Sequence, residues 1–376
     1  MRKYFFNALL LCVTLFLCFS ALEVWLRYFN RVDFRINRGE IVLPINRVYD
    51  IKNTLHARGI EPFIHHTKNS LGFRGPGPDS RQGRFSIIAV GGSTTECFYL
   101  SDGKDWPALL AGKLHARGID IWMNNAGMDG HSSFGHYILL RDHIAPLHPN
   151  MVLILVGLND IQRSDLNRYE TLFLHKGVIF SSPYAFVRSL LREAELRSKL
   201  VEFLMNVYRV AKARRMGVNH QAIDPSQEPQ YVVSPREASQ MLSGHEPYVQ
   251  GYAVRLRRLV DLCHEQRITP VLLTQPALYG VATDPATGAD LGRMRVCENS
   301  NGAVQWHVLE KYNQATRDVA TETGTGYVDL ARLLPKDSAY FYDLYHFSVA
   351  GAEAVAGILA RALPPILAEA GCRARP

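Results

Sequence analysis

The most restrictive feature of this 376-residue sequence is the alternation of short, largely apolar runs with longer stretches of helical pattern. Such runs, bounded by turn residues, predict buried strands, and the periodicity between them predicts helices. Strands that alternate with helices are typical of a parallel sheet covered on both faces. The sequence therefore predicts an α/β fold, a three-layer α/β/α sandwich with five parallel strands at residues 85–90, 119–123, 151–156, 270–274 and 326–330.

The predicted helices follow these strands at about 104–117, 133–146, 248–267, 303–322 and 348–368. One segment, residues 164–246, interrupts the alternation between the third and fourth strands and is longer than an ordinary loop. Its helical stretch 186–216 carries eight Lys or Arg against three Glu, a net +5 of the chain's formal +7. This helical insertion could serve as a lid, as a membrane-surface helix or as a binding site for an anionic substrate. It could equally be an ordinary helical hairpin with a solvated charged face.

Residues 1–26 form a predicted membrane-targeting segment. After Arg2 and Lys3, residues 4–22 contain no charge and are long enough to cross a hydrocarbon core of about 30 Å. No good cleavage site of small residues follows, so we expect an uncleaved signal anchor, a single transmembrane helix. On charge alone the body would be cytoplasmic, because two cations precede the span and four follow it soon after, namely Arg27, Arg31, Arg35 and Arg38.

Composition excludes several classes of protein. With 47% apolar and 20% charged residues, the chain is neither disordered, collagen-like nor a coiled coil. The six cysteines show no spacing typical of a zinc site, so we expect no metal, and they leave disulfides open. The net charge favours anionic surroundings, but a chain that begins with a membrane span is a poor candidate for nucleic-acid binding. The turn-rich residues 27–84 predict a juxtamembrane stem before a body at 85–370.

Polar residues with catalytic potential follow the first three predicted strands. Ser93, in the turn Gly91-Gly92-Ser93, would lie at the carboxyl edge of the sheet, as a nucleophile or as a plain helix N-cap. Gly127, after the second strand, would let a backbone N–H approach a reacting oxygen or would simply form a turn. After the third strand, the Asn159 amide can donate to a developing oxyanion, and Asp160 is expected to cap the following turn.

A histidine and a carboxylate stand together just before the last predicted helix. Asp343 and His346 are three residues apart on one short loop. Asp343 can bind one ring nitrogen and fix the tautomer, which leaves the other nitrogen to act as general base toward a serine. Three further residues are expected to be structural: Cys97 as a small buried apolar residue, His131 as a surface loop histidine and His136 as a solvated helix residue.

Together these elements resemble, in order and in strand context, the conserved blocks of the SGNH hydrolases, the GDSL-like esterases and lipases, over about residues 69–362. The resemblance implies that Ser93 is the nucleophile, with Gly127 and Asn159 as oxyanion residues and Asp343 and His346 as acid and base. It also implies a flavodoxin-like sheet and no cofactor. The sequence departs from the family pattern at Gly92, where the family usually has Asp, which loosens the subfamily assignment.

Two lesser likenesses, Asn69-Ser70-Leu71-Gly72-Phe73-Arg74-Gly75 and Leu273-Thr274-Gln275-Pro276, resemble membrane-anchored members. Such members work outside the cytoplasm, which implies a single-pass protein of the bacterial inner membrane with a periplasmic catalytic domain. The expected function is hydrolysis of O-acyl esters on a cell-envelope glycan or a lipid. Two alternatives are an acyltransferase that passes the acyl group to a sugar hydroxyl within the envelope polysaccharide machinery, and an inactive scaffold that binds an anionic polymer.

Overall fold

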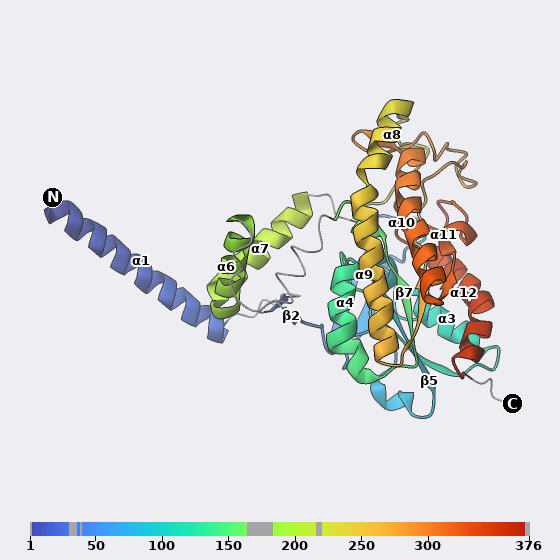
Figure 1. Cartoon of the computed structure of the whole chain (residues 1–376), viewed down its shortest axis with the longest axis horizontal. Coiled ribbons are helices and arrows are strands. Elements are labelled where there is room, and N and C mark those ends of the chain that lie inside the picture. The colour runs from blue at the N-terminus through green and yellow to red at the C-terminus, as the bar shows by residue number, and fades with distance from the viewer. Residues whose placement is uncertain (1, 30–35, 38–39, 164–182, 216–219, 373–376) are drawn as a thin grey trace. The chain divides into compact units, whose positions relative to one another are not determined.

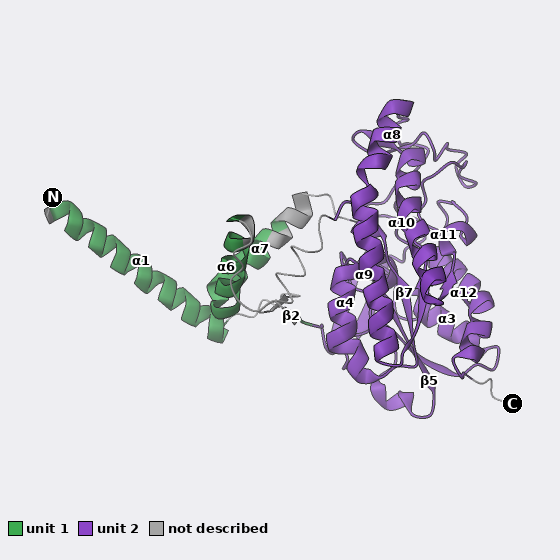
Figure 2. Ribbon diagram, viewed as in Figure 1, with its two compact units in different colours: residues 1–42, 165–219 green, residues 43–164, 220–376 purple. Residues whose placement is uncertain are grey.

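The computed structural model describes residues 2–29, 36–37, 40–163, 183–215 and 220–372. The chain forms two compact units, one of residues 1–42 and 165–219 and a larger one of residues 43–164 and 220–376 (Figure 2). The larger unit holds the sheet and the predicted site. The smaller unit holds helices α1 (Arg2–Phe29), α6 (Pro183–Arg197) and α7 (Lys199–Arg215) and the short strands β1 (Ile36–Asn37) and β2 (Glu40–Ile41).

The larger unit is built on a five-stranded parallel sheet in the order β11-β8-β7-β5-β6 (Figure 1). Its strands begin and end within two residues of the predicted ones: β5 Phe85–Gly91, β6 Ile121–Asn125, β7 Met151–Leu155, β8 Thr269–Leu273 and β11 Gly326–Val328. The first of these in the chain, β5, pairs with β6 on one side and β7 on the other. This is the flavodoxin-like order, so the predicted fold is confirmed.

Helices cover both faces of the sheet. On one face α3 (Trp106–His115) packs with α12 (Val349–Glu369); on the other lie α4 (Ser133–Leu139), α9 (Glu246–Glu265) and α10 (Gly302–Thr323) (Figure 1). Buried side chains of β5 alternate between the faces: Ile87 and Ala89 join the cluster formed with α3 and α12, and their neighbours point the other way. Helix α12 is long and apolar enough to cross a membrane, but 44% of its most apolar stretch is buried within the protein, as in the core helix of a soluble domain.

Shorter elements connect these layers. Helix α4 continues through a π-helical turn, Leu140–Ile144, and a 3-10 turn, Ala145–Leu147. A capping box of Ser234 and Glu237 starts helix α8 (Pro235–Gly244), which contacts α9 and α10. The remaining elements are α2 (Ser93–Glu96), α11 (Leu330–Leu333), the 3-10 turns Pro78–Arg81 and Leu158–Asp160, and the antiparallel pair β9 (Arg295–Cys297) and β10 (Ser300–Asn301).

The insertion predicted at 164–246 is divided between the two units. Helices α6 and α7 belong to the smaller unit, and residues 220–246 belong to the larger one. The positions 164–182 and 216–219 of this predicted segment lie outside the described residues. The insertion is therefore two structures, a helical hairpin and a return segment that ends on the sheet domain.

The predicted stem differs from the structure, because residues 43–84 belong to the larger unit. Strands β3 (Arg47–Lys52) and β4 (Phe63–Lys68) form an antiparallel hairpin there. The segment is held by Arg74, whose side chain is 1% exposed. Its guanidinium donates to the carbonyls of Glu96, Cys97 and Leu100 at 2.7–2.9 Å, and Nη2 lies 3.4 Å from an Asp105 carboxylate oxygen. Because this segment contains many polar and turn residues, sequence reasoning did not predict that part of it is buried.

We expect Arg74→Ala to lower the free energy of unfolding by about 3–5 kcal/mol, because it leaves the buried Asp105 carboxylate and three carbonyls without their donor. Urea denaturation of the purified chain, followed by tryptophan fluorescence, measures the change. Arg293→Ala is the matched control, since this arginine is 67% exposed in its side chain and its surface ion pair contributes less than about 1 kcal/mol. Equal stability of the two variants would show that the Arg74 contacts do not hold the larger unit together.

Candidate active site

Ser93 begins helix α2 in a tight turn at the carboxyl end of β5. Glycines precede it because there is no room for side chains. A Cβ on Gly91 would lie 2.7 Å from the Leu155 carbonyl oxygen, and one on Gly92 would lie 2.5 Å from Asn159 Nδ2. A side chain at position 92, where the family usually has Asp, would therefore require the end of the Asn159 side chain to shift from its position in this structure.

The loop before α12 brings His346 to Ser93. His346 Nε2 is 2.7 Å from Ser93 Oγ, and His346 Nδ1 is 2.5 Å from Asp343 Oδ2. Asp343 Oδ1 accepts the backbone N–H groups of Tyr345 and His346 at 2.8 and 2.7 Å, so the carboxylate is fixed by its own loop. Ser348 caps α12 by accepting from the Gly351 N–H. The three predicted residues thus lie in one chain of hydrogen bonds.

The Asp343 carboxylate is buried yet stays ionised. Burial raises its pKa, but the charge and hydrogen bonds of His346 and the Tyr345 N–H outweigh burial, and the pKa ends below its usual value. An ionised Asp343 holds the proton on His346 Nδ1, which leaves Nε2 as the acceptor that faces Ser93. The arrangement can remove the Ser93 hydroxyl proton and stabilise the imidazolium that results.

Asn159 lies on the short turn Leu158–Asp160 after β7, next to Gly92 and so close to Ser93. Its Nδ2 donates one hydrogen to the His131 carbonyl at 2.9 Å, which orients the amide. An amide nitrogen carries two hydrogens, so the second is available to a substrate oxygen. The position over Gly92 suits the predicted oxyanion role.

Gly127 lies under helix α2, where its lack of a side chain is required. A Cβ there would lie 2.2 Å from the Glu96 backbone nitrogen. Its own N–H donates to Asn125 Oδ1 at 2.9 Å, so the oxyanion role of Gly127 stays a prediction that needs this bond to open. Between Ala126 and His131, the N–H of Gly130 is the one with no acceptor among the described residues.

The sequence suggested that Asp160 caps the turn that follows it, but the structure shows a different role. Its carboxylate accepts from the Ser133 N–H at 3.0 Å and from Ser133 Oγ at 2.6 Å, so it caps the start of α4. Arg255 Nη2 lies 3.0 Å from the same buried carboxylate. Asp160 therefore ties the loop that carries Asn159 to α4 and α9.

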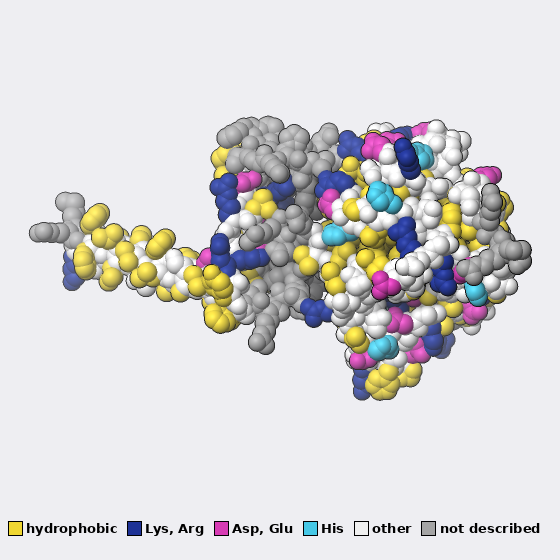
Figure 3. Space-filling model, turned by 90° about the horizontal axis from the view of Figure 1, so that it is seen from below, with side chains coloured by type: hydrophobic (Ala, Val, Ile, Leu, Met, Phe, Trp, Pro, Cys, Tyr) yellow, Lys and Arg dark blue, Asp and Glu magenta, His cyan; other side chains and the backbone are white. Residues whose placement is uncertain are grey.

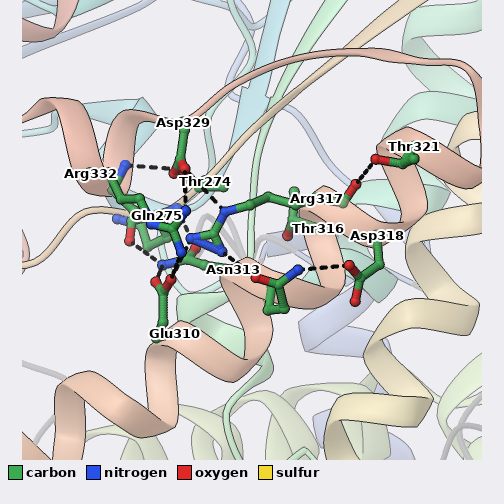
Figure 4. A network of polar contacts seen from close by, with 12 residues as sticks. Thr274, Gln275, Glu310, Asn313, Thr316, Arg317, Asp318, Thr321, Asp329 and Arg332 are labelled. Atoms are coloured by element: carbon green, nitrogen blue, oxygen red, sulfur yellow. Dashed lines mark hydrogen bonds and ion pairs between the residues drawn. The ribbon is translucent and has the colours of Figure 1, made fainter.

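The residues after β8 contact the turn that carries Ser93. Gln275 Oε1 accepts from the hydroxyl of Thr94, the residue after Ser93, at 3.2 Å. The backbone of Gln275 is held in turn by both amide atoms of Asn313 on α10, at 2.7 and 3.1 Å. Figure 4 shows this network, in which Arg317 reaches Asp329 and Glu310 and joins α10 to the end of β11.

Sequence reasoning missed His220, which follows the hairpin in the chain. Its ring centroid is 4.1 Å from that of His346, and its Nδ1 is 2.6 Å from the Tyr342 hydroxyl. Nε2 lies 3.8 Å from the Asp129 carboxylate, and Tyr99 meets the ring edge to face at 4.8 Å. His220 thus covers one face of the His346 ring. It stands in no motif, so only the fold could reveal it.

Three ionisable side chains could approach a metal ion. Within the part of the chain that the structure describes, His220, Asp343 and His346 form one such group, with ligand atoms within 4.8 Å of one another. Asp343 and His346 already bind each other, and His346 also binds Ser93. Metal coordination here would break the hydrogen bonds of the triad, so the group is better explained as a proton relay with a neighbouring ring.

The other candidate residues have structural roles. Cys97 is buried, and burial raises the pKa of its thiol to about 12, so it is a poor second nucleophile. His136 is 1% exposed, and burial lowers its pKa well below the usual value. The expectation that His136 is solvated was therefore wrong. It lies on the inner side of α4, where the neutral imidazole is packed like an apolar ring.

Among solved structures, the chain is similar to the acetylxylan esterase Axe2 of Geobacillus stearothermophilus, with 18% identity, a TM-score of 0.40 and coverage of 78% of this chain and 98% of the other. It is also similar to a G-D-S-L family protein of Desulfitobacterium hafniense, with 12% identity, a TM-score of 0.40 and coverage of 74% and 99%. A comparison with curated proteins gives no match.

The profile of the GDSL-like lipase/acylhydrolase family matches residues 89–354, well over half of the chain, from the end of β5 to the first turns of α12. The match begins four residues before Ser93 and ends eight residues after His346, so it contains every residue of the candidate site. The chain belongs to the GDSL-like lipase/acylhydrolase family, as an SGNH-type hydrolase.

Proposed function

We propose that the protein is a membrane-anchored serine esterase that hydrolyses O-acyl esters of a cell-envelope glycan or a lipid outside the cytoplasm. The observation that carries the proposal is the continuous hydrogen-bonded chain from Ser93 Oγ through His346 to Asp343. The N-terminal helix, which could act as a membrane span or a signal sequence, supports the location. The bacterial inner membrane with a periplasmic body is the arrangement we infer from the resemblance.

The mechanism follows from the positions of the atoms. His346 Nε2 takes the proton of Ser93 Oγ as the oxygen attacks the ester carbonyl. Asp343 stabilises the imidazolium, which then protonates the departing alcohol. Water, deprotonated by His346, attacks the acyl-enzyme and releases the acid and free Ser93. Every step uses one proton that moves between His346 and an oxygen.

Negative charge on the carbonyl oxygen is held by hydrogen-bond donors on three loops. We assign the Ser93 N–H and the second Asn159 amide hydrogen to this oxyanion hole. The loop after β6 supplies the third donor, predicted from the sequence to be Gly127. The Gly127 N–H donates to Asn125 in this structure, so it can take this role only when that bond opens.

An acyltransferase would use the same residues and differ in the group that attacks the acyl-enzyme. A sugar hydroxyl in place of water gives transfer instead of hydrolysis, and water exclusion decides between them. The intact triad argues against an inactive scaffold, because a polymer-binding protein has no need of an aligned nucleophile, base and acid.

Ser93→Ala should abolish labelling by a fluorophosphonate probe and lower turnover of p-nitrophenyl acetate by about 10⁴-fold or more, because no nucleophile remains. Ser80→Ala, which removes an exposed hydroxyl, is the control and should behave as the parent. Labelling of the parent without turnover would favour transfer, which an added oligosaccharide acceptor would then reveal by its acylation. Unchanged labelling of Ser93→Ala would remove Ser93 from the mechanism.

Asn159→Ala and Gly92→Ala should weaken the same oxyanion donor. The first removes the amide, and the second places a Cβ 2.5 Å from it. We expect Asn159→Ala to lower kcat by about 10²–10³-fold, and Gly92→Ala to lower it less because the amide is displaced and not removed, while fluorophosphonate labelling is still detectable in both. The double variant should be little slower than the slower single one, because both act on one donor. Multiplicative losses in the double variant would show that Gly92 acts separately from Asn159.

His220→Ala should lower kcat by up to about tenfold, because the loss of a ring contact worth about 0.5–1.5 kcal/mol frees one face of His346. His220→Phe should restore most of the rate, since it keeps a ring over the base. Steady-state kinetics that separate kcat from KM measure both variants. A change confined to KM in both would assign His220 to substrate binding instead of to positioning His346.

A further inference from the structure

Helices α6 and α7 expose apolar side chains and bury polar ones, the reverse of a helix pair in water. On α6, Val187, Leu190 and Leu191 are 53%, 42% and 42% exposed, and on α7, Leu204, Val207 and Tyr208 are 56%, 45% and 58% exposed. Each set has the spacing i, i+3, i+4 and so forms one stripe along its helix. The buried side chains of the pair include Ser189, Glu195, Glu202 and Asn206.

The turn between α6 and α7 is bound to α1 by two side chains. Glu23 accepts the N–H groups of Lys199 and Leu200, both at 2.9 Å, and the Ser198 hydroxyl at 2.8 Å. It therefore caps the start of α7, where a negative charge is favoured. Arg27 Nη2 donates to the carbonyl of Arg197, the last residue of α6, at 2.9 Å. The hairpin is thus fixed at a defined level of α1.

That level is the end of the predicted span. The apolar helix Lys3–Phe29 has 27 residues, about 40 Å at 1.5 Å per residue, so it exceeds a hydrocarbon core of about 30 Å. The uncharged run ends at Leu22, and apolar side chains cover the helix surface before it (Figure 3). Beyond it stand Trp25 and Tyr28, exposed residues of the kinds that favour the headgroup region. Glu23 precedes Trp25 in the chain, and Arg27 lies between Trp25 and Tyr28.

We propose that the α6–α7 hairpin lies in the interface of the membrane that α1 crosses, with its two apolar stripes against the acyl chains. This rests on the proposed anchoring of the chain by α1. The surface is continuous with a membrane-crossing helix, because the hairpin turn is bonded to the end of that helix. A lipid surface is the partner that accommodates helices with apolar side chains exposed and polar ones buried.

The charge of the hairpin fits phospholipid headgroups. Residues 183–215 contain eight Lys or Arg and three Glu. Arg188 is exposed, and the Arg197 side chain is 81% exposed at the turn. Long basic side chains next to an apolar stripe can reach phosphate groups while their helix lies in the interface.

The test uses the full chain with Cys12, Cys18 and Cys297, the cysteines that are exposed, replaced by serine. A fluorophore of the NBD type is attached to Val207→Cys, and the protein is placed in lipid nanodiscs of phosphatidylcholine and phosphatidylglycerol. Some discs carry phosphatidylcholine with a doxyl quencher on an upper acyl carbon. Val232→Cys in the larger unit, 81% exposed as the parent valine, is the matched control, and Leu15→Cys reports on α1 itself.

We expect the label at Val207 to lose roughly half of its emission in doxyl discs, and the label at Val232 to lose little. Quenching at Leu15 without quenching at Val207 would overturn the proposal while leaving the anchor intact. No quenching at Leu15 would refute the anchor and the hairpin together. A blue-shifted Val207 label that doxyl lipid does not quench would show a protein partner, such as a second copy, and would also overturn the proposal.

Discussion

The site depends on the double pairing of β5. Because β5 lies between β6 and β7 in parallel register, the three turns that leave these strands meet at one edge of the sheet. Ser93, the proposed nucleophile, comes from the first, the loop with Gly127 from the second and Asn159 from the third. The parallel arrangement places the turns after successive strands at the same edge, whereas strands linked by hairpins have successive turns at opposite edges. The order of the strands thus determines which residues lie close enough to act together.

Packing then leaves α2 little freedom. At one end, Gly92 has no side chain and so leaves room for the Asn159 amide; at the other, Arg74 donates to the carbonyls of Glu96 and Cys97. Glu96 is itself buried, with Lys68 at 3.1 Å and the Asp129 N–H at 2.6 Å. Buried charges of this kind are costly unless each is paired, and here the pairs link β4, α2 and the loop after β6. A hydroxyl on so short a helix stays within reach of His346 only because both ends are fixed.

Much of this could be predicted from the sequence, for identifiable reasons. The five strands are short apolar runs, and Asp343 and His346 are close in the chain, so local pattern was enough. Asp160, His220 and the segment 43–84 were misjudged or missed because their partners are distant. Asp160 meets α4 and α9, His220 reaches the base across more than 120 residues, and Arg74 is buried by carbonyls that carry no sequence signal. The engagement of the Gly127 N–H by Asn125 is a matter of side-chain rotamer, which no motif specifies.

For the α6–α7 hairpin, the sequence shows the helical pattern and the excess of basic residues, but it does not show what the helices contact. Periodicity shows that α6 and α7 are amphipathic, but it cannot tell which side of each helix is covered. Glu23 resolves this ambiguity. A carboxylate at the end of an apolar helix is expensive unless it is bonded, and Glu23 is bonded both to Arg27 of its own helix and to the N–H groups of α7. These bonds hold the hairpin turn against α1, and in this arrangement the apolar stripes of α6 and α7 stay exposed, where water is the least favourable of the available surroundings.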